Sequence, residues 1–170
     1  MKVEWFDAYT PKELDLAQDM YDIVFSPDLI TFLSERHPLL DYNWRTDNEA
    51  IRTMLRWPYE GLLFDVENAN LWLPDWGSRP LTEAGRAGRL KEIVDDAPKL
   101  IPLCGHRYLP AYPEEADNPV FSVYQSDIIY YGTNLHEYIG RESHLPVTVP
   151  VSAKLKPIPF WAQFADDMFP

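Results

Sequence analysis

The sequence predicts an α+β protein in which N-terminal helices pack on one face of an antiparallel, possibly mixed, sheet of about five to six strands. Capping signals and helical apolar stripes mark the first sixty residues, and β-branched and aromatic runs follow. Residues 118–139 are the most informative stretch, because they read as a strand, a tight turn, a second strand and a short helix. We expect one domain over residues 1–170, with residues 145–170 as an extended C-terminal segment.

Three helix starts are marked before residue 60. A capping box at residues 10–13 opens the first helix, which should bury one apolar stripe: Leu14, Ala17, Met20, Tyr21 and Val24. Residues 26–28 open a second helix that ends at His37. A second capping box at residues 46–49 opens a third helix, which should stop at Trp57 because the residue before a proline avoids the α region.

The hydrophobic period changes after residue 60. Residues 61–67 are expected to form a strand, with residues 71–73 returning as its partner across a turn rich in Asn. Thr82 should cap a fourth helix that Pro98 ends. The chain therefore changes from helix to sheet and back before its second half.

The second half should supply most of the sheet. Residues 99–105 and 107–109 are expected to pair, with Pro102 indicating an edge strand or a bulge, because proline donates no ladder hydrogen bond. Residues 120–125 and 128–131 form the next predicted hairpin, and Asn134 is the expected N-cap of the closing helix.

The C-terminal segment carries two patterns. Valines alternate at positions 147, 149 and 151, which indicates extended backbone interrupted by prolines. Four apolar residues beyond them are expected to form a short amphipathic helix that clamps the body of the protein: Phe160, Trp161, Phe164 and Met168.

The chain is acidic, with a formal net charge of −12 and a pI of about 4.6. This charge disfavours direct binding to nucleic acid or to an anionic membrane, because both require Lys and Arg to meet phosphates. It favours encounter with a basic protein. Cys104 is the only cysteine, the N-terminal residues lack an apolar signal-peptide core, and no apolar run reaches the roughly 20 residues of a membrane span, so we expect a cytoplasmic protein.

Residues that could carry chemistry are few. Cys104 and His106 lie two apart on a predicted strand, with no third group placed to orient the histidine. His136 and His144 lack the ligand spacings typical of zinc, so we expect no metal and no other cofactor. The acids of the proline-rich loop 111–119 are expected to be solvated. A hydrolase that uses His106 with a carboxylate remains an alternative to a binding protein.

The aromatic residues are more numerous than one small core needs, with six Trp and ten Tyr. Amphipathic rings often form contact surfaces, so we expect some of them on a partner-binding rim of the sheet, beside a histidine, an arginine and acids. The predicted contact residues are Trp72, Asp75, Trp76, His106, Arg107, Tyr108, Asp127 and Tyr131. Exposed rings and edge strands are compatible with a monomer or a weak homodimer.

Three segments carry a family resemblance over roughly residues 25–140. They are the Ile-Pro-Leu strand within Leu100 to Leu109, the Pro-Val-Phe strand within Asn118 to Tyr124, and the closing helix Asn134 to Ile139. Their order resembles the SUKH superfamily, the Smi/Knr-type domains. The resemblance implies an α+β domain without enzymatic activity. Bacterial members resemble immunity proteins that bind and neutralise polymorphic toxins, many of them nucleases, and fungal relatives act in cell-wall regulation.

The resemblance and the acidic charge together favour a non-enzymatic immunity protein that occludes the active site of a basic toxin domain. A regulatory or scaffold module that binds some other protein is the second hypothesis. The two differ in the partner and share the expectation of a protein-binding surface.

Overall fold

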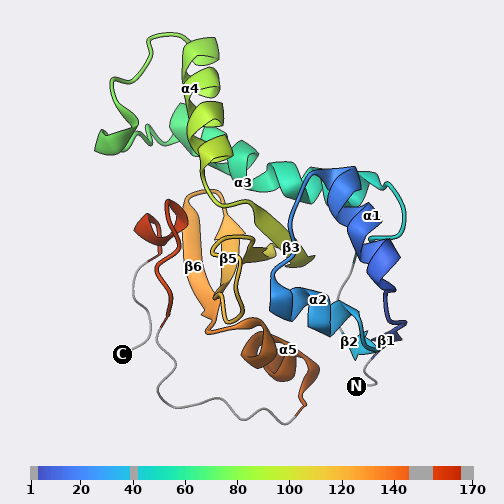
Figure 1. Cartoon of the computed structure of the whole chain (residues 1–170). Helices are drawn as coiled ribbons and strands as arrows, with labels where there is room; N and C mark the ends of the chain where they lie inside the picture. Colours follow the sequence, from blue (N-terminus) through green and yellow to red (C-terminus); the bar gives the residue numbers. More distant parts are fainter. Residues whose placement is uncertain (1–3, 39–41, 146–154, 166–170) are drawn as a thin grey trace.

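A computed structural model describes residues 4–38, 42–145 and 155–165 of the chain. Its elements follow in the order β1, α1, α2, β2, α3, α4, β3, β4, β5, β6 and α5, with a 3-10 turn η1 between α3 and α4 and another, η2, near the C-terminus (Figure 1). All the strand pairs are antiparallel. The predicted α+β class is therefore confirmed.

The first two helices begin where their caps predict. α1 (Pro11–Tyr21) starts behind Thr10, whose hydroxyl accepts a hydrogen bond from the backbone of Glu13 while the Glu13 carboxylate accepts one from the backbone of Thr10. α2 (Pro27–Leu33) follows with proline at its first position. Beside them β1 (Trp5–Phe6) and β2 (His37–Pro38) pair as a separate two-stranded sheet.

The main sheet is a four-stranded meander. Its strands are β3 (Leu100–Cys104), β4 (Arg107–Pro110), β5 (Val120–Tyr124) and β6 (Asp127–Gly132), and they lie in sequence order. The predicted sheet of five to six strands is thus too large, because the other two strands form their own sheet. Pro102 lies on the edge strand β3 beside a register irregularity, as its missing N–H predicts.

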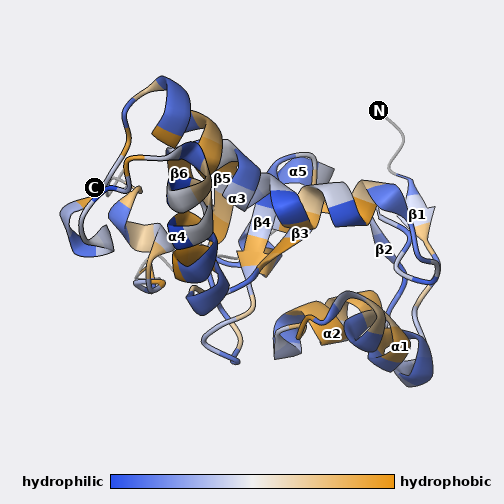
Figure 2. Ribbon diagram, turned by 90° about the horizontal axis from the view of Figure 1, so that it is seen from above, coloured by the Kyte–Doolittle hydropathy of each residue, from blue (hydrophilic) through white to orange (hydrophobic). Residues whose placement is uncertain are grey.

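Both faces of the main sheet are covered, which corrects the prediction of helices on one face. On one face Ile101, Leu103 and Leu109 belong to the same buried cluster as side chains of α1, α2 and α5 (Leu135–Ser143). On the other face Leu100 and Phe121 belong to a second cluster with α4 (Glu83–Asp96), the second half of α3 and the C-terminal segment. Figure 2 shows α1 and α2 well apart from α4, with α3 running between the two groups.

The third helix is longer than predicted. α3 (Glu49–Asn68) runs through Trp57 and Pro58, and it contains the residues 61–67 that the sequence pattern assigns to a strand. Residues 71–73 are not a strand either. Both expectations are wrong, and the helix instead forms one continuous rod along the top of the sheet in Figure 1.

Packing explains why this helix continues. Proline has no N–H, so Pro58 leaves the Met54 carbonyl, four residues earlier, without its helical donor. The hydroxyl of Tyr108, on β4, donates to that carbonyl at 2.7 Å. Beyond the proline, Leu62 and Val66 are fully buried at helical i, i+4 spacing. Gly61 lets the helix approach the β5–β6 turn, since a Cβ there would lie 2.9 Å from the Gln125 Cα.

Residues 155–165 pack on the face of the main sheet that α4 and the second half of α3 cover, which we call the outer face. Ile158 and Trp161 are buried there, and the Trp161 indole N–H donates to the Pro98 carbonyl at 2.7 Å. The predicted amphipathic helix is reduced to a single 3-10 turn, η2 (Trp161–Gln163), which does pack against the body as expected. The predicted valine alternation at residues 147–151, and Met168, lie outside the described residues.

His37 is a buried titratable group between the small sheet and α2. Its ring stacks on Phe6 and Tyr9, and Nδ1 lies 2.8 Å from the Glu35 carbonyl, so Nδ1 carries a proton. Desolvation by burial, together with the charge of Arg45, lowers the pKa of His37 below its ordinary value although the hydrogen bond to Glu35 opposes the shift.

Mild acid should therefore destabilise the fold through His37. The unfolded chain takes up the proton near the ordinary pKa of 6.5, whereas the folded chain takes it up only at lower pH. Stability contributed by the neutral ring is thus present above that pH and is lost as the pH falls below it. Urea unfolding between about pH 7.5 and 5.5 should show a steeper fall for the native protein than for His37→Gln. Equal slopes would contradict the lowered pKa.

Candidate functional site

The eight predicted contact residues form two groups in the structure instead of one rim. One group lies on β4, β6 and the adjoining turn, and the other lies in the connection between α3 and α4. The sheet group consists of His106, Arg107, Tyr108, Asp127 and Tyr131, and the connection carries Trp72, Asp75 and Trp76.

Two of the eight are core residues, which corrects their predicted exposure. Trp76, only 3% exposed, lies edge-on to Trp72 and stacks on Phe160 of the C-terminal segment, with ring centres 5.3 and 6.3 Å apart. Tyr108 is fully buried, and its hydroxyl bonds to the carbonyl of Met54. Neither side chain can touch a partner in this conformation.

The rest of the connection faces outward to different degrees. Trp72 is half-buried, and its indole N–H donates to the Gly77 carbonyl at 2.7 Å. Asp75, on η1 (Pro74–Trp76), is exposed. Leu81, at 97% exposed, is the most exposed large apolar side chain among the described residues.

Arg107 and Tyr131 meet on the face of the main sheet that α5 covers. The Arg107 guanidinium carbon lies 3.8 Å from the centre of the Tyr131 ring, and the Nη1 N–H of the same group donates to the Ser122 hydroxyl at 2.9 Å. Arg141 of α5 lies 4.7 Å from the same ring, whose hydroxyl donates to Glu142 at 3.1 Å. These contacts of Arg107 and Tyr131 tie the sheet to α5.

His106 lies in the β3–β4 turn, with its ring 6.2 Å from that of Tyr124 in a T-shaped arrangement. Partial burial and the positive charge of Arg107 both lower the pKa of His106. Both effects favour the neutral ring, whereas a neighbouring carboxylate would favour the charged one. Asp127 is exposed across from Tyr124 at the start of β6. This arrangement offers no support for a His106–carboxylate pair.

A different surface brings exposed apolar and acidic side chains together. On α1, Leu16 is 53% exposed and Met20 is 37% exposed, and the two lie one helical turn apart. Val24, 46% exposed, follows the end of the helix. Acidic residues flank these apolar side chains. We call this surface the acidic face and define it as Asp15, Leu16, Asp19, Met20, Asp22, Val24, Tyr112 and Glu114.

The acidic face ends in a hollow of about 330 Å³ between the end of α1 and the loop 111–119. Val24 and Tyr112, which is 59% exposed, give it apolar walls, while Asp22 and Glu114 add carboxylates. Lys99 reaches into the same place and pairs with the Asp22 carboxylate at 3.2 Å. The hollow could therefore hold an apolar stem that carries a positive charge at its tip.

Acidic lining continues on the other side of the same loop. A second hollow, of about 440 Å³, lies between α2 and the start of α5. Asp28, Glu35 and Asp117 line it beside the apolar side chains of Phe32 and Leu135. Negative charge thus extends over two hollows that flank one loop.

The sequence pattern misplaced two members of the acidic face. Met20 and Val24 were expected in the buried stripe of the first helix, and both are exposed, so that expectation is wrong. The helix ends at Tyr21, and Asp22 adopts a left-handed conformation, so Val24 no longer follows the helical stripe. The sequence does hint at the acidic face, because Asp15 and Asp19 lie four residues apart and so share one side of the helix.

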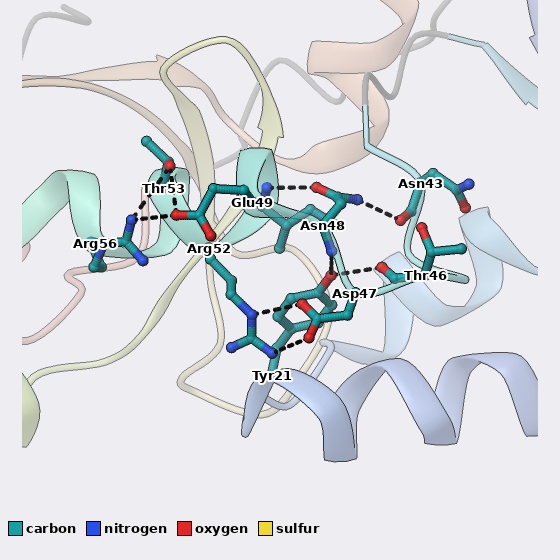
Figure 3. Close-up of polar contacts among 10 residues, drawn as sticks. Tyr21, Asn43, Thr46, Asp47, Asn48, Glu49, Arg52, Thr53 and Arg56 are labelled. Atoms are coloured by element: carbon teal, nitrogen blue, oxygen red, sulfur yellow. Dashed lines mark hydrogen bonds and ion pairs between the residues drawn. The ribbon is translucent and has the colours of Figure 1, made fainter.

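A polar network fixes α1 against the start of α3 (Figure 3). The buried Tyr21 hydroxyl donates to the Thr46 carbonyl at 2.8 Å and accepts from the Asn48 backbone at 3.0 Å. The Asn48 side chain caps α3. Arg52 donates two hydrogen bonds to the Asp47 carboxylate, and they hold the pKa of Asp47 below its usual value. The acidic face is therefore presented on a helix with a firmly anchored C-terminal end.

A further hollow of about 300 Å³ lies among α3, α4 and β3. Apolar side chains such as Leu55, Val94 and Trp161 line it. Among the charged side chains that line this hollow, Lys91 pairs with Asp95.

Within the three described ranges, no group of three or more His, Cys, Asp and Glu side chains is arranged to hold a metal ion. Among the same residues, no helix is both long enough and apolar enough to cross a membrane. No protein-family model, no curated protein and no solved structure matches the chain. The fold thus defines an α+β protein with a four-stranded antiparallel meander, and the SUKH resemblance stays a prediction.

Proposed function

We propose that the chain is a non-enzymatic protein-binding domain of the immunity type, acting in the cytoplasm on a basic toxin domain. The observation that carries the proposal is the acidic face, where exposed apolar side chains lie among carboxylates. Occlusion of the toxin's active site by direct binding would neutralise the toxin without any chemistry by this chain.

Two physical effects support binding at this face. Carboxylates at Asp15 and Asp19 attract a basic surface and speed encounter, in keeping with the overall charge of −12. Leu16 and Met20 gain from leaving water once the partner has docked, because buried apolar contacts supply much of the affinity of an interface. Charge therefore selects the partner, and apolar contact retains it.

The resemblance to the SUKH superfamily supports a toxin as the partner over a regulatory target. A scaffold or regulatory module would use the same face for a different protein. The hydrolase alternative has less support, since the His106 ring lies against Tyr124 and the neighbouring charge that acts on it is that of Arg107 and not of a carboxylate.

Reversing charge on the acidic face should weaken binding to the partner. The test measures calorimetric affinity for the protein encoded next to this chain's gene. Asp15→Lys with Asp19→Lys should raise Kd at least about tenfold, or about 1.4 kcal/mol, and the native interaction should weaken as salt increases.

The matched control is Glu92→Lys with Asp96→Lys, two exposed acids at the same i, i+4 spacing on α4. The control pair should leave Kd within about twofold. Equal weakening of binding by the two pairs of substitutions would refute binding at the acidic face. An affinity that neither pair changes would refute it as well.

A further inference from the structure

The outer side of α1 has the shape of one half of a helix–helix contact. Leu16 and Met20 form a ridge because residues four apart on a helix lie one above the other. Asp15 and Asp19 run beside the ridge with the same spacing. A partner helix with apolar residues and Lys or Arg at i, i+4 spacing would match the ridge and the acids together.

Strand addition at the β3 edge of the main sheet fits less well. The edge strand β3 contains Pro102, which has no N–H to offer an added strand, and its register is irregular between Pro102 and Cys104. A partner that docks by backbone pairing would meet this irregular edge, whereas the α1 ridge requires only side-chain contacts.

We infer that the partner presents a basic amphipathic helix that lies along α1, an inference that rests on the proposed function. Charge complementarity identifies this occupant, since carboxylates border the apolar ridge and continue to Asp22 and Glu114. The partner helix lays its apolar stripe on Leu16 and Met20, as amphipathic helices do on apolar surfaces.

The hollow at the end of the ridge gives this helix a fixed register. A Lys or Arg side chain entering between Val24 and Tyr112 would bury its aliphatic stem against them and bring its charge to Glu114. Lys99 already pairs with the Asp22 carboxylate, so Glu114 is the acid of this hollow that meets the partner's charge. The hollow therefore favours a long basic residue at one end of the partner's apolar stripe.

A peptide experiment tests this geometry without the natural partner. The probe is a fluorescent Leu/Lys peptide of about 15 residues with apolar residues at helical spacing, compared with a peptide that differs only by a proline at its centre. Fluorescence anisotropy should show at least about tenfold tighter binding of the helical peptide to the native protein.

Leu16→Ala with Met20→Ala should abolish that preference, whereas Leu81→Ala, at an exposed site on the α3–α4 connection, should preserve it. Unchanged thermal melting would show that both variants fold. Equal binding of the two peptides, or a preference that survives loss of Leu16 and Met20, would overturn the helix inference. If Asp15→Lys with Asp19→Lys still weakened the natural complex, the proposed function would stand without it.

Discussion

Trp161→Ala is expected to lower the free energy of unfolding by about 3–5 kcal/mol, the range for removing a buried Trp side chain. The indole is almost fully buried in the cluster on the outer face of the main sheet, and it contacts Phe160 with ring centres 4.8 Å apart. The substitution also leaves the Pro98 carbonyl without the indole N–H that now donates to it at 2.7 Å. Urea denaturation followed by circular dichroism measures the loss.

Two further variants separate the causes. Trp161→Phe keeps an aromatic ring but removes the donor and part of the indole volume, so it should cost about 1–3 kcal/mol through the unsatisfied carbonyl and a small cavity. Gln163→Ala, on the same 3-10 turn but exposed, should change stability by less than about 0.5 kcal/mol. A loss below about 1 kcal/mol for Trp161→Ala would contradict a structural role for the C-terminal segment.

Local signals predicted where three of the helices start. Thr10, Thr82 and Asn134 each cap the helix that the sequence assigns to them, because a side-chain oxygen near a helix start satisfies backbone donors wherever the helix lies. The last two hairpins were predictable for the same reason, since their turns and alternation are encoded within a few residues.

Distant contacts account for what the sequence pattern missed in the fold. Whether a helix survives Pro58 depends on Tyr108, which lies fifty residues further along the chain. Likewise, residues 61–67 contain enough bulky apolar side chains to suit a strand, and only the burial of Leu62 and Val66 against the sheet makes the helix preferable. Neither of these contacts can be predicted from the neighbouring sequence.

The candidate site shows a similar division. Arg107 and Tyr131 were both placed on strands of the sheet, and the structure brings their side chains into contact, which the hairpin pattern alone does not predict. Trp76 was expected at the surface because aromatic abundance suggests exposed rings, yet Phe160 of the returning C-terminal segment covers it. The acidic face went unrecognised because an apolar residue such as Met20 fits a buried stripe in sequence, and only tertiary packing leaves it exposed.

Tyr108→Phe should cost about 2 kcal/mol, although it removes a single oxygen atom. The hydroxyl supplies the donor that Pro58 withholds from the Met54 carbonyl, and this contact is buried in the sheet–α3 interface. Burial also raises the pKa of the Tyr108 phenol far above its ordinary value, so the hydroxyl keeps its proton and remains a donor at every pH at which the protein is folded.

A double-mutant cycle identifies the cause of that loss. In Pro58→Ala the new backbone N–H can donate to the Met54 carbonyl, so the carbonyl no longer depends on the phenol. Tyr108→Phe should then cost less by about 1 kcal/mol or more in the Pro58→Ala background than in the native protein. Urea unfolding of the four proteins measures this difference. Equal costs in both backgrounds would mean that the Tyr108 hydroxyl stabilises the fold independently of Pro58, and the passage of α3 through Pro58 would then need another explanation.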